Sequence, residues 1–146
     1  MHQRVFSRRV LLISVLSLIS LAAIGSTLLP ASTTTISVST VENWLYHVDA
    51  HDSNASWQEA SSFFQEKLSK EKWETIVKTT RAPIGTVIRR RHTVTQYASH
   101  LPGIPDGTYA ILQFHSTFTG KESTVETVVF SKESDGQWRA IGYSMK

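Results

Sequence analysis

Glu126 is the residue of this sequence that best fits acid–base chemistry. It interrupts a mainly apolar stretch, and strand alternation places it on the face shared by Thr124, Val128 and Phe130. A carboxylate on a buried face can serve as a general acid or base when its surroundings shift its pKa. The same position also suits a structural ion pair with a cation such as Arg81, because most buried carboxylates are paired. Both interpretations remain open from the sequence.

Other side chains could contribute to a ligand site, and the candidates are Arg81, Tyr109, His115 and Tyr143. Arg81 precedes a rigid Pro-Ile-Gly turn, where a guanidinium is pre-organised to bind a carboxylate. The same segment can instead be the corner between a helix and the sheet, since proline ends helices and Gly85 frees the next turn. Asp49 and Asp106 are weaker candidates, and Asp106 before Gly107 is typical of a turn.

The sequence predicts neither a metal site nor a cofactor. His47 and His51 would share one helix face, with Asp52 beside them, but no third protein ligand is placed there. HExxH, Gly-x-Ser-x-Gly and glycine-rich phosphate motifs are all lacking. The absence of cysteine excludes disulfides and thiol catalysis. Any catalysis would therefore depend on the carboxylate, tyrosine and histidine side chains named above.

The N-terminal region has the layout of an export signal. Arg4, Arg8 and Arg9 precede an uncharged run whose apolar part, residues 10–24, is shorter than the roughly 20 residues of a membrane span. Small residues up to Gly25 offer a cleavage site, so we expect a signal peptide over residues 1–25 and a periplasmic or secreted protein. An uncleaved inner-membrane anchor is the alternative, because Leu28 and Leu29 could extend the apolar stretch.

Charge argues against a nucleic-acid partner. The chain has 15 Lys and Arg against 12 Asp and Glu, and three of its arginines lie in the leader. The remainder is therefore electrically balanced, without the basic excess that nucleic-acid binding needs. In the Arg89-Arg90-Arg91 cluster, strand alternation sends Arg90 to the face opposite its neighbours. We interpret this cluster as a solvated strand end.

Helices are predicted first in the domain of residues 40–146, after a Ser/Thr-rich linker over residues 26–39. Ser39 and Glu42 are spaced as a capping box before an apolar face at helical spacing. A second capping box, Ser56 with Glu59, predicts a second helix or a kinked continuation of the first. A third helix is predicted after Ser69 and ends before the proline of the Arg81 turn.

Strands follow in the second half of the domain, near residues 86–97, 109–118, 123–131 and 137–145, separated by turns rich in Gly, Pro and Asp. In the second strand, Ala110, Leu112 and Phe114 should face the helices, whereas Tyr109 and His115 should face away. These patterns predict an α+β domain with N-terminal helices packed on a curled four-stranded antiparallel sheet. A half-apolar outer sheet face could support a homodimer.

An ordered set of motifs resembles the bacterial exported family catalogued as domain of unknown function 4019. The match covers roughly residues 41–143, and its motifs are Trp44-Leu45, Val48-Asp49, Ser56-Trp57, Trp73, Arg81-Ala82-Pro83-Ile84-Gly85, Leu101-Pro102-Gly103-Ile104-Pro105-Asp106-Gly107-Thr108-Tyr109, Glu126-Thr127-Val128 and Gly136-Gln137-Trp138 to Gly142-Tyr143. The resemblance implies an exported single domain, similar in element order to the cone of nuclear transport factor 2, ketosteroid isomerases and cystatin-like proteins. It implies no activity.

The expected function is therefore that of an exported binding or interaction domain without catalysis. Its partner would be a protein or small molecule of the cell envelope, with membrane contact only through the leader. A small cone-fold hydrolase or isomerase using Glu126 is the alternative, and an uncleaved leader would indicate a membrane-tethered assembly factor. A deep, partly polar pocket would favour the enzyme, whereas an interior filled by aromatic side chains would favour the binding domain.

Overall fold

The computed structural model describes residues 35–146. Its helices come first and its strands follow: α1 (Val38–Asp49), α2 (Ser53–Gln58), α3 (Ser62–Lys67), α4 (Lys70–Arg81), the 3-10 turn η2 (Ala82–Ile84), then β1 (Val87–Ala98), β2 (Tyr109–Phe118), β3 (Lys121–Lys132) and β4 (Trp138–Met145). This order confirms the predicted α+β class. The predicted signal peptide and most of the predicted linker lie outside the described residues.

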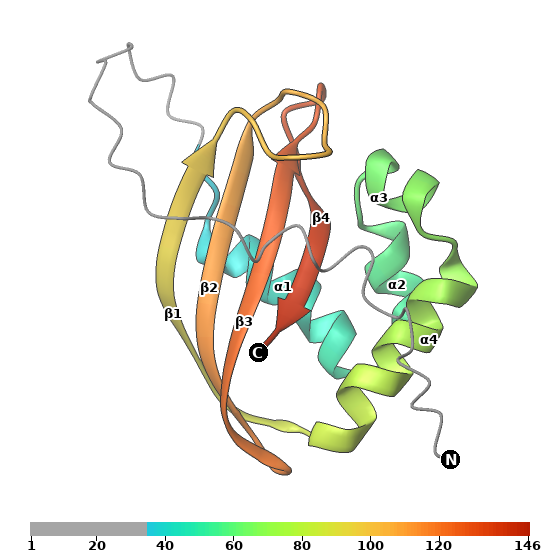
Figure 1. The fold of residues 1–146 in the computed structure, drawn as a ribbon, viewed down its shortest axis with the longest axis vertical. Helices are drawn as coiled ribbons and strands as arrows, with labels where there is room; N and C mark the ends of the chain where they lie inside the picture. Colours follow the sequence, from blue (N-terminus) through green and yellow to red (C-terminus); the bar gives the residue numbers. More distant parts are fainter. Residues whose placement is uncertain (1–34) are drawn as a thin grey trace, which may run out of the picture.

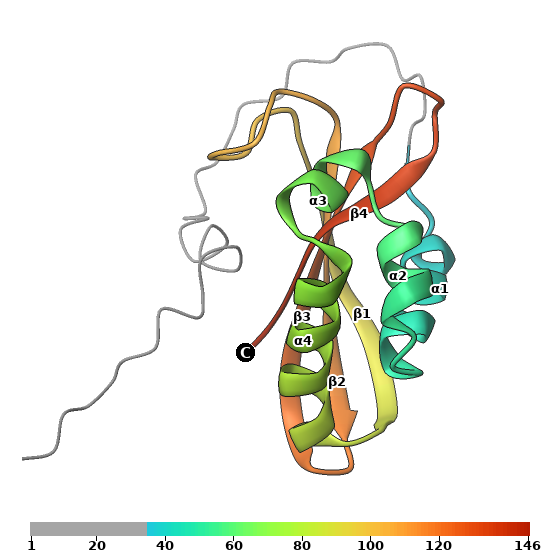
Figure 2. The same cartoon turned by 90° about the vertical axis from the view of Figure 1, so that its right-hand side faces the viewer.

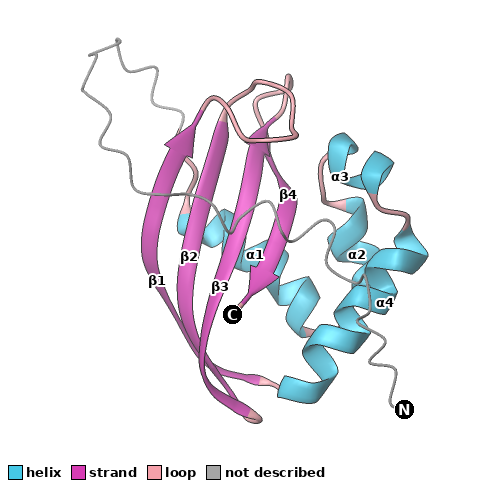
Figure 3. Ribbon diagram, viewed as in Figure 1, coloured by secondary structure: helices cyan, strands magenta, loops and turns pink. Residues whose placement is uncertain are grey.

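The four strands form one antiparallel meander in the order β1-β2-β3-β4. Helix α1 lies behind one face of the sheet, whereas α4 runs alongside it, beyond the β4 edge (Figure 1, Figure 2). Figure 3 shows the same arrangement by element type, with all helices on one side of the strands or beyond β4. The predicted strand over residues 109–118 has the bounds of β2, and the other three differ by at most two residues at either end.

Helix α1 begins two residues earlier than predicted from a cap at Ser39. The Ser37 side chain accepts a hydrogen bond from the Thr40 backbone N–H, so the N-cap is Ser37 and not Ser39. Ile36, just before the cap, and Val41 in the first turn are both buried in the core. This is the placement of a hydrophobic staple, which favours the earlier of the two serines.

The second predicted helix is two short helices. Asp52 caps α2 by accepting from Ala55 N–H, and Ser61 caps α3 by accepting from Phe64 N–H. The prediction of a cap at Ser56 was therefore wrong. Ser69 caps α4, as predicted.

Ser56 instead lies in the core between helices, where two indoles bind it. Trp44 Nε1 donates to the Ser56 carbonyl at 2.8 Å, and Trp73 Nε1 donates to its Oγ at 2.9 Å. The Trp44 and Trp73 rings stack with centroids 5.9 Å apart, and Phe64 meets Trp73 edge-on at 5.2 Å. With Phe114 fully buried from the sheet side, aromatic rings fill the interior between helices and sheet.

A smaller apolar cluster lies on the opposite face of the sheet. Its buried members are Leu101, Tyr109, Ile111, Val129 and Ile141. The β1–β2 connection projects on this side (Figure 2), and Ile104 from that connection packs against the cluster. Alternate residues of β2 therefore lie on opposite faces of the sheet, as predicted from the sequence.

Candidate functional site

Glu126 lies at the centre of a buried polar cluster on the helix side of the sheet. Arg90 Nε donates to Glu126 Oε1 at 2.8 Å, and Arg90 Nη2 donates to Oε2 at 3.1 Å. The Ser116 hydroxyl also donates to Oε1, and the Tyr143 hydroxyl donates to Oε2 at 2.7 Å. Glu126 is completely inaccessible to solvent. Each carboxylate oxygen therefore accepts two hydrogen bonds inside the fold.

Asp49 and Arg81 complete the cluster. Arg90 donates to both Asp49 oxygens, at 2.7 and 3.0 Å, and Arg81 Nη2 donates to Asp49 Oδ1. Arg81 Nη1 is 3.8 Å from Glu126 Oε2. We call Asp49, Arg81, Arg90 and Glu126 the charge cluster, in which two arginines balance two carboxylates.

Arg81 is more deeply buried than Arg90, with 1% of its surface exposed. Its guanidinium lies over the Phe118 ring, 4.4 Å from the centroid, a cation–π arrangement. Arg81 Nε is buried without a hydrogen-bond partner among the described residues. Charge pairing and the aromatic ring therefore hold this side chain, with incomplete hydrogen bonding.

Local sequence explains how four elements bring these charges together. Asp49 and Arg81 are the last residues of α1 and α4, and Pro83 and Gly85 turn the chain into β1 directly after Arg81. Gly85 has φ +75°, a conformation that side-chain-bearing residues rarely adopt. The sheet register then places Arg90 opposite Ser116. The predicted corner is thus observed, and its arginine points inward to an ion pair.

The electrostatics of the cluster keep Glu126 ionised. Burial by itself raises the pKa of Glu126, but the Arg90 hydrogen bonds and charge, with Ser116 and Tyr143, outweigh it and lower the pKa below the ordinary value. For Arg90, burial is likewise outweighed by hydrogen bonds to Asp49 and Glu126, which raise its pKa. A carboxylate held in this way is a poor proton donor at neutral pH.

The predicted site residues divide between the two faces of the sheet. Arg81 and the weaker candidate Asp49 belong to the charge cluster, and Tyr143 donates to its Glu126. Tyr109 lies on the other face, where its hydroxyl donates to the Pro105 carbonyl. His115 is also away from the cluster, with Nε2 3.1 Å from the hydroxyl of Ser123. Asp106 pairs with His100 at the surface. The structure therefore assembles three of these candidates with Glu126 and leaves three outside.

Arg90 is the cluster residue that the sequence did not mark as a site residue. The interpretation of residues 89–91 as a solvated strand end is wrong for Arg90, whose side chain is only 11% exposed. Arg89 and Arg91 are exposed, as expected. Alternation separates Arg90 from Arg89 and Arg91, but only the register of β1, β2 and β3 shows that Arg90 shares its face with Glu126.

Neither metal nor membrane features emerge from residues 35–146. His47 lies 3.3 Å from Glu59, and His51 adopts φ +56° beyond the end of α1. The described part of the chain contains no group of three His, Cys, Asp or Glu side chains suited to hold a metal ion. None of the helices in that part combines the length and apolar composition that crossing a membrane requires.

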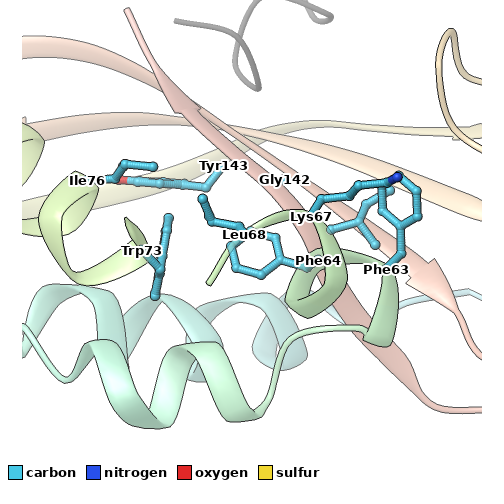
Figure 4. A pocket seen from close by; sticks show the side chains of 9 residues that line it. Phe63, Phe64, Lys67, Leu68, Trp73, Ile76, Gly142 and Tyr143 are labelled. Carbon is cyan, nitrogen blue, oxygen red and sulfur yellow. The ribbon is translucent and has the colours of Figure 1, made fainter. Parts of the chain in front are cut away.

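An apolar cleft opens between α3, α4 and β4, and we call it the β4 cleft. Its lining comprises Phe63, Phe64, Lys67, Leu68, Trp73, Ile76, Ile141, Gly142 and Tyr143, and its volume is about 50 Å³. Figure 4 shows the side chains arranged along β4, from Ile76 and Tyr143 at one end to Phe63 and Lys67 at the other. Tyr143 is thus shared by this cleft and the hydrogen bonds of Glu126.

Replacing Tyr143 with Phe is expected to reduce the loss of stability above pH 10. Burial, followed by the charge of Glu126, raises the pKa of Tyr143 well above its ordinary value of 10.0. The unfolded chain releases this proton near pH 10 while the fold retains it, so stability falls as pH rises toward the folded pKa. Urea unfolding between about pH 8 and pH 11 checks this, with exposed Tyr46→Phe as control. Identical alkaline losses in wild type and Tyr143→Phe would contradict it.

Comparison with known proteins gives one finding. The family described as "Protein of unknown function (DUF4019)" matches residues 40–143. The match spans every element from the first turn of α1 to β4 and includes all four residues of the charge cluster. No curated protein matches the chain at a significant level.

Proposed function

The chain belongs to the DUF4019 family, and from its geometry we propose that it is an exported binding or interaction domain that acts without catalysis. The observation that carries this proposal is that Glu126 is enclosed by the fold and has no contact with solvent. Both of its oxygens are occupied by internal donors, and it is fully buried. A general acid or base must instead reach a substrate proton directly or through one water.

The packing of the interior supports the same proposal. Trp44, Phe64, Trp73 and Phe114 are buried between the helices and the sheet, and Trp57 packs against them. The β4 cleft has a volume of about 50 Å³, far below the several hundred Å³ usual for small-molecule sites. Two more open hollows of about 300 and 310 Å³ reach the lower end of that range, but no residue of the charge cluster lines either of them. A hydrolase or isomerase using Glu126 would need a substrate chamber at a position that the charge cluster fills. Recognition at the surface is therefore the function that we propose.

The proposal includes the cone fold and export. Helices on one side of a four-stranded antiparallel meander support an arrangement like the nuclear transport factor 2-like and cystatin-like cones. Export rests on the basic residues and short apolar stretch of residues 1–25. In the alternative, an uncleaved leader makes the same domain an inner-membrane-anchored assembly factor.

Native mass spectrometry of the protein recovered from its own cell envelope tests this proposal. We expect the measured mass to be that of a chain that begins near Ser26. A partner or ligand should add to this mass and separate on denaturation. A retained leader would identify the anchored factor, and recovery from the cytoplasm alone would contradict export. Turnover of a substrate by wild type that disappears in Glu126→Gln, with folding intact, would contradict the absence of catalysis.

A further inference from the structure

Strand β4 has an outer edge whose C-terminal part carries unused backbone hydrogen-bonding groups, whereas the Ala140 carbonyl already accepts from the Ser61 N–H at 2.9 Å. Val125 and Lys146 exchange both backbone hydrogen bonds, so Met145 and Tyr143, one and three residues earlier, occupy non-hydrogen-bonded positions toward β3. Their N–H and C=O groups therefore point away from the sheet. None of these four groups has a partner among the described residues. Backbone polar groups at such an edge are a template for another strand.

The β4 cleft lies directly beside this edge. Figures 1 and 2 both place α4 alongside β4, and Figure 4 shows the cleft following the strand. Ile76, on α4, is half-buried at one end of the lining. The side chains of Tyr143 and Glu126 meet on the inner face, so the inner face of an added strand would look into the cleft. Edge and cleft thus form one continuous surface.

Lys67 gives this surface its charge. It is exposed, its ammonium lies 5.7 Å from the Phe63 ring centroid, and no carboxylate pairs with it among the described residues. No other charged residue lines the cleft. The complementary group on a ligand is therefore a carboxylate.

The other edge of the sheet is protected against strand addition. Strand β1 has two register irregularities, between Val87 and Arg89 and between His92 and Val94. Arg89 and Arg91 are exposed along it. Bulges and charged side chains are the features that keep edge strands from pairing. The only irregularity between β3 and β4 lies before Gly142, outside the Tyr143–Met145 stretch.

We propose that the β4 edge binds an extended segment of a partner protein as an antiparallel fifth strand, with apolar side chains at alternating positions in the β4 cleft and an acidic side chain at Lys67. This proposal rests on the binding function proposed above and names its partner class. The residues opposite Tyr143 and Met145 would supply the missing backbone partners. Their side chains would point to the inner face, where about 50 Å³ accepts a small aliphatic group.

Selection from a displayed library of random twelve-residue peptides against the full chain tests this inference. We expect the selected peptides to share two apolar residues separated by one, with an acidic residue nearby. Ile76→Lys should weaken their binding by about tenfold or more, a typical effect for the centre of an interface. The matched control is Ile88→Lys on β1, where Ile88 is 65% exposed, and it should change affinity less than about twofold. Circular dichroism verifies that both variants fold.

A backbone measurement makes the test independent of the variants. Methylating the amide nitrogens of the two apolar peptide residues removes the N–H groups aimed at β4 and should abolish binding. Methylating the residue between them should leave binding unchanged. Equal effects of both methylations would overturn strand addition.

Other outcomes of the selection decide where a peptide binds and whether the partner is a peptide at all. Peptides that depend on Ile88, or on neither isoleucine, would overturn the β4 site and leave the binding function standing. A library without any enriched peptide would overturn a peptide partner. A wild-type dimer in sedimentation velocity that Ile76→Lys dissociates would show that the edge is occupied by a second copy of this chain.

Discussion

Glu126→Ala is expected to lower the free energy of unfolding by about 3–5 kcal/mol, the cost of breaking a buried ion pair by removing one partner. The substitution leaves Arg90, which is 11% exposed, with only Asp49 as a counter-ion at hydrogen-bonding distance. It also leaves the hydroxyls of Ser116 and Tyr143 without their acceptor. Urea unfolding at neutral pH measures the effect.

Glu122→Ala is the matched control, because Glu122 is an exposed glutamate on the same strand. It should change stability by no more than about 0.5 kcal/mol. Equal effects of the two substitutions would show that the charge cluster contributes nothing specific. The double substitution Glu126→Leu with Arg90→Met should recover much of the loss, because it removes both charges together and leaves Arg81 paired with Asp49.

The contribution of Glu126 should also disappear in acid. Because the folded pKa of Glu126 lies below its ordinary value of 4.5, its stabilisation is fully present above that value. It is lost as pH falls through the lower folded pKa, where the native carboxylate finally takes up a proton. The stability difference between wild type and Glu126→Ala should therefore shrink in that window.

Trp73→Ala is expected to lower the free energy of unfolding by about 3–5 kcal/mol, as large-to-small core substitutions do. Trp73 is 2% exposed and packs against both Trp44 and Phe64. Its loss leaves a cavity at the point where α4 meets α2, and it removes the donor to Ser56 Oγ. Far-UV circular dichroism in urea measures the change without depending on tryptophan fluorescence.

The control for Trp73 is Tyr46→Ala on α1, where the aromatic side chain is 68% exposed. We expect it to alter stability by less than about 0.5 kcal/mol. A small effect at Trp73 would mean that the helices repack around the gap, and that the core tolerates a larger internal space than its aromatic packing indicates.

The strands could be predicted well because their signals are local. Turn residues bracket β2 on both sides, and its alternation separates Leu112 from Tyr109 correctly. The start of α1 was harder, since Ser37 and Ser39 carry the same capping hydroxyl. Burial of Ile36 in the core, a tertiary contact, separates them.

The charge cluster was only partly predictable, because it too depends on tertiary contacts. The inward direction of Glu126 and a pairing with Arg81 could be inferred from alternation and composition. The role of Arg90 depends on the β1–β2 register and on where α1 ends, because its partners are Asp49 and Glu126. Those positions are fixed by packing between distant segments, which single-sequence patterns do not encode.

The charge cluster has a consequence for the order of events during folding. Its members lie at positions 49, 81, 90 and 126, so the charges can leave water together only after α1, α4, β1 and β3 have met. Contacts so distant along the chain incur their loop-closure entropy before they stabilise anything. We therefore expect the cluster to form late, after the transition state. Substitutions in the cluster should then mainly speed unfolding and change the folding rate little.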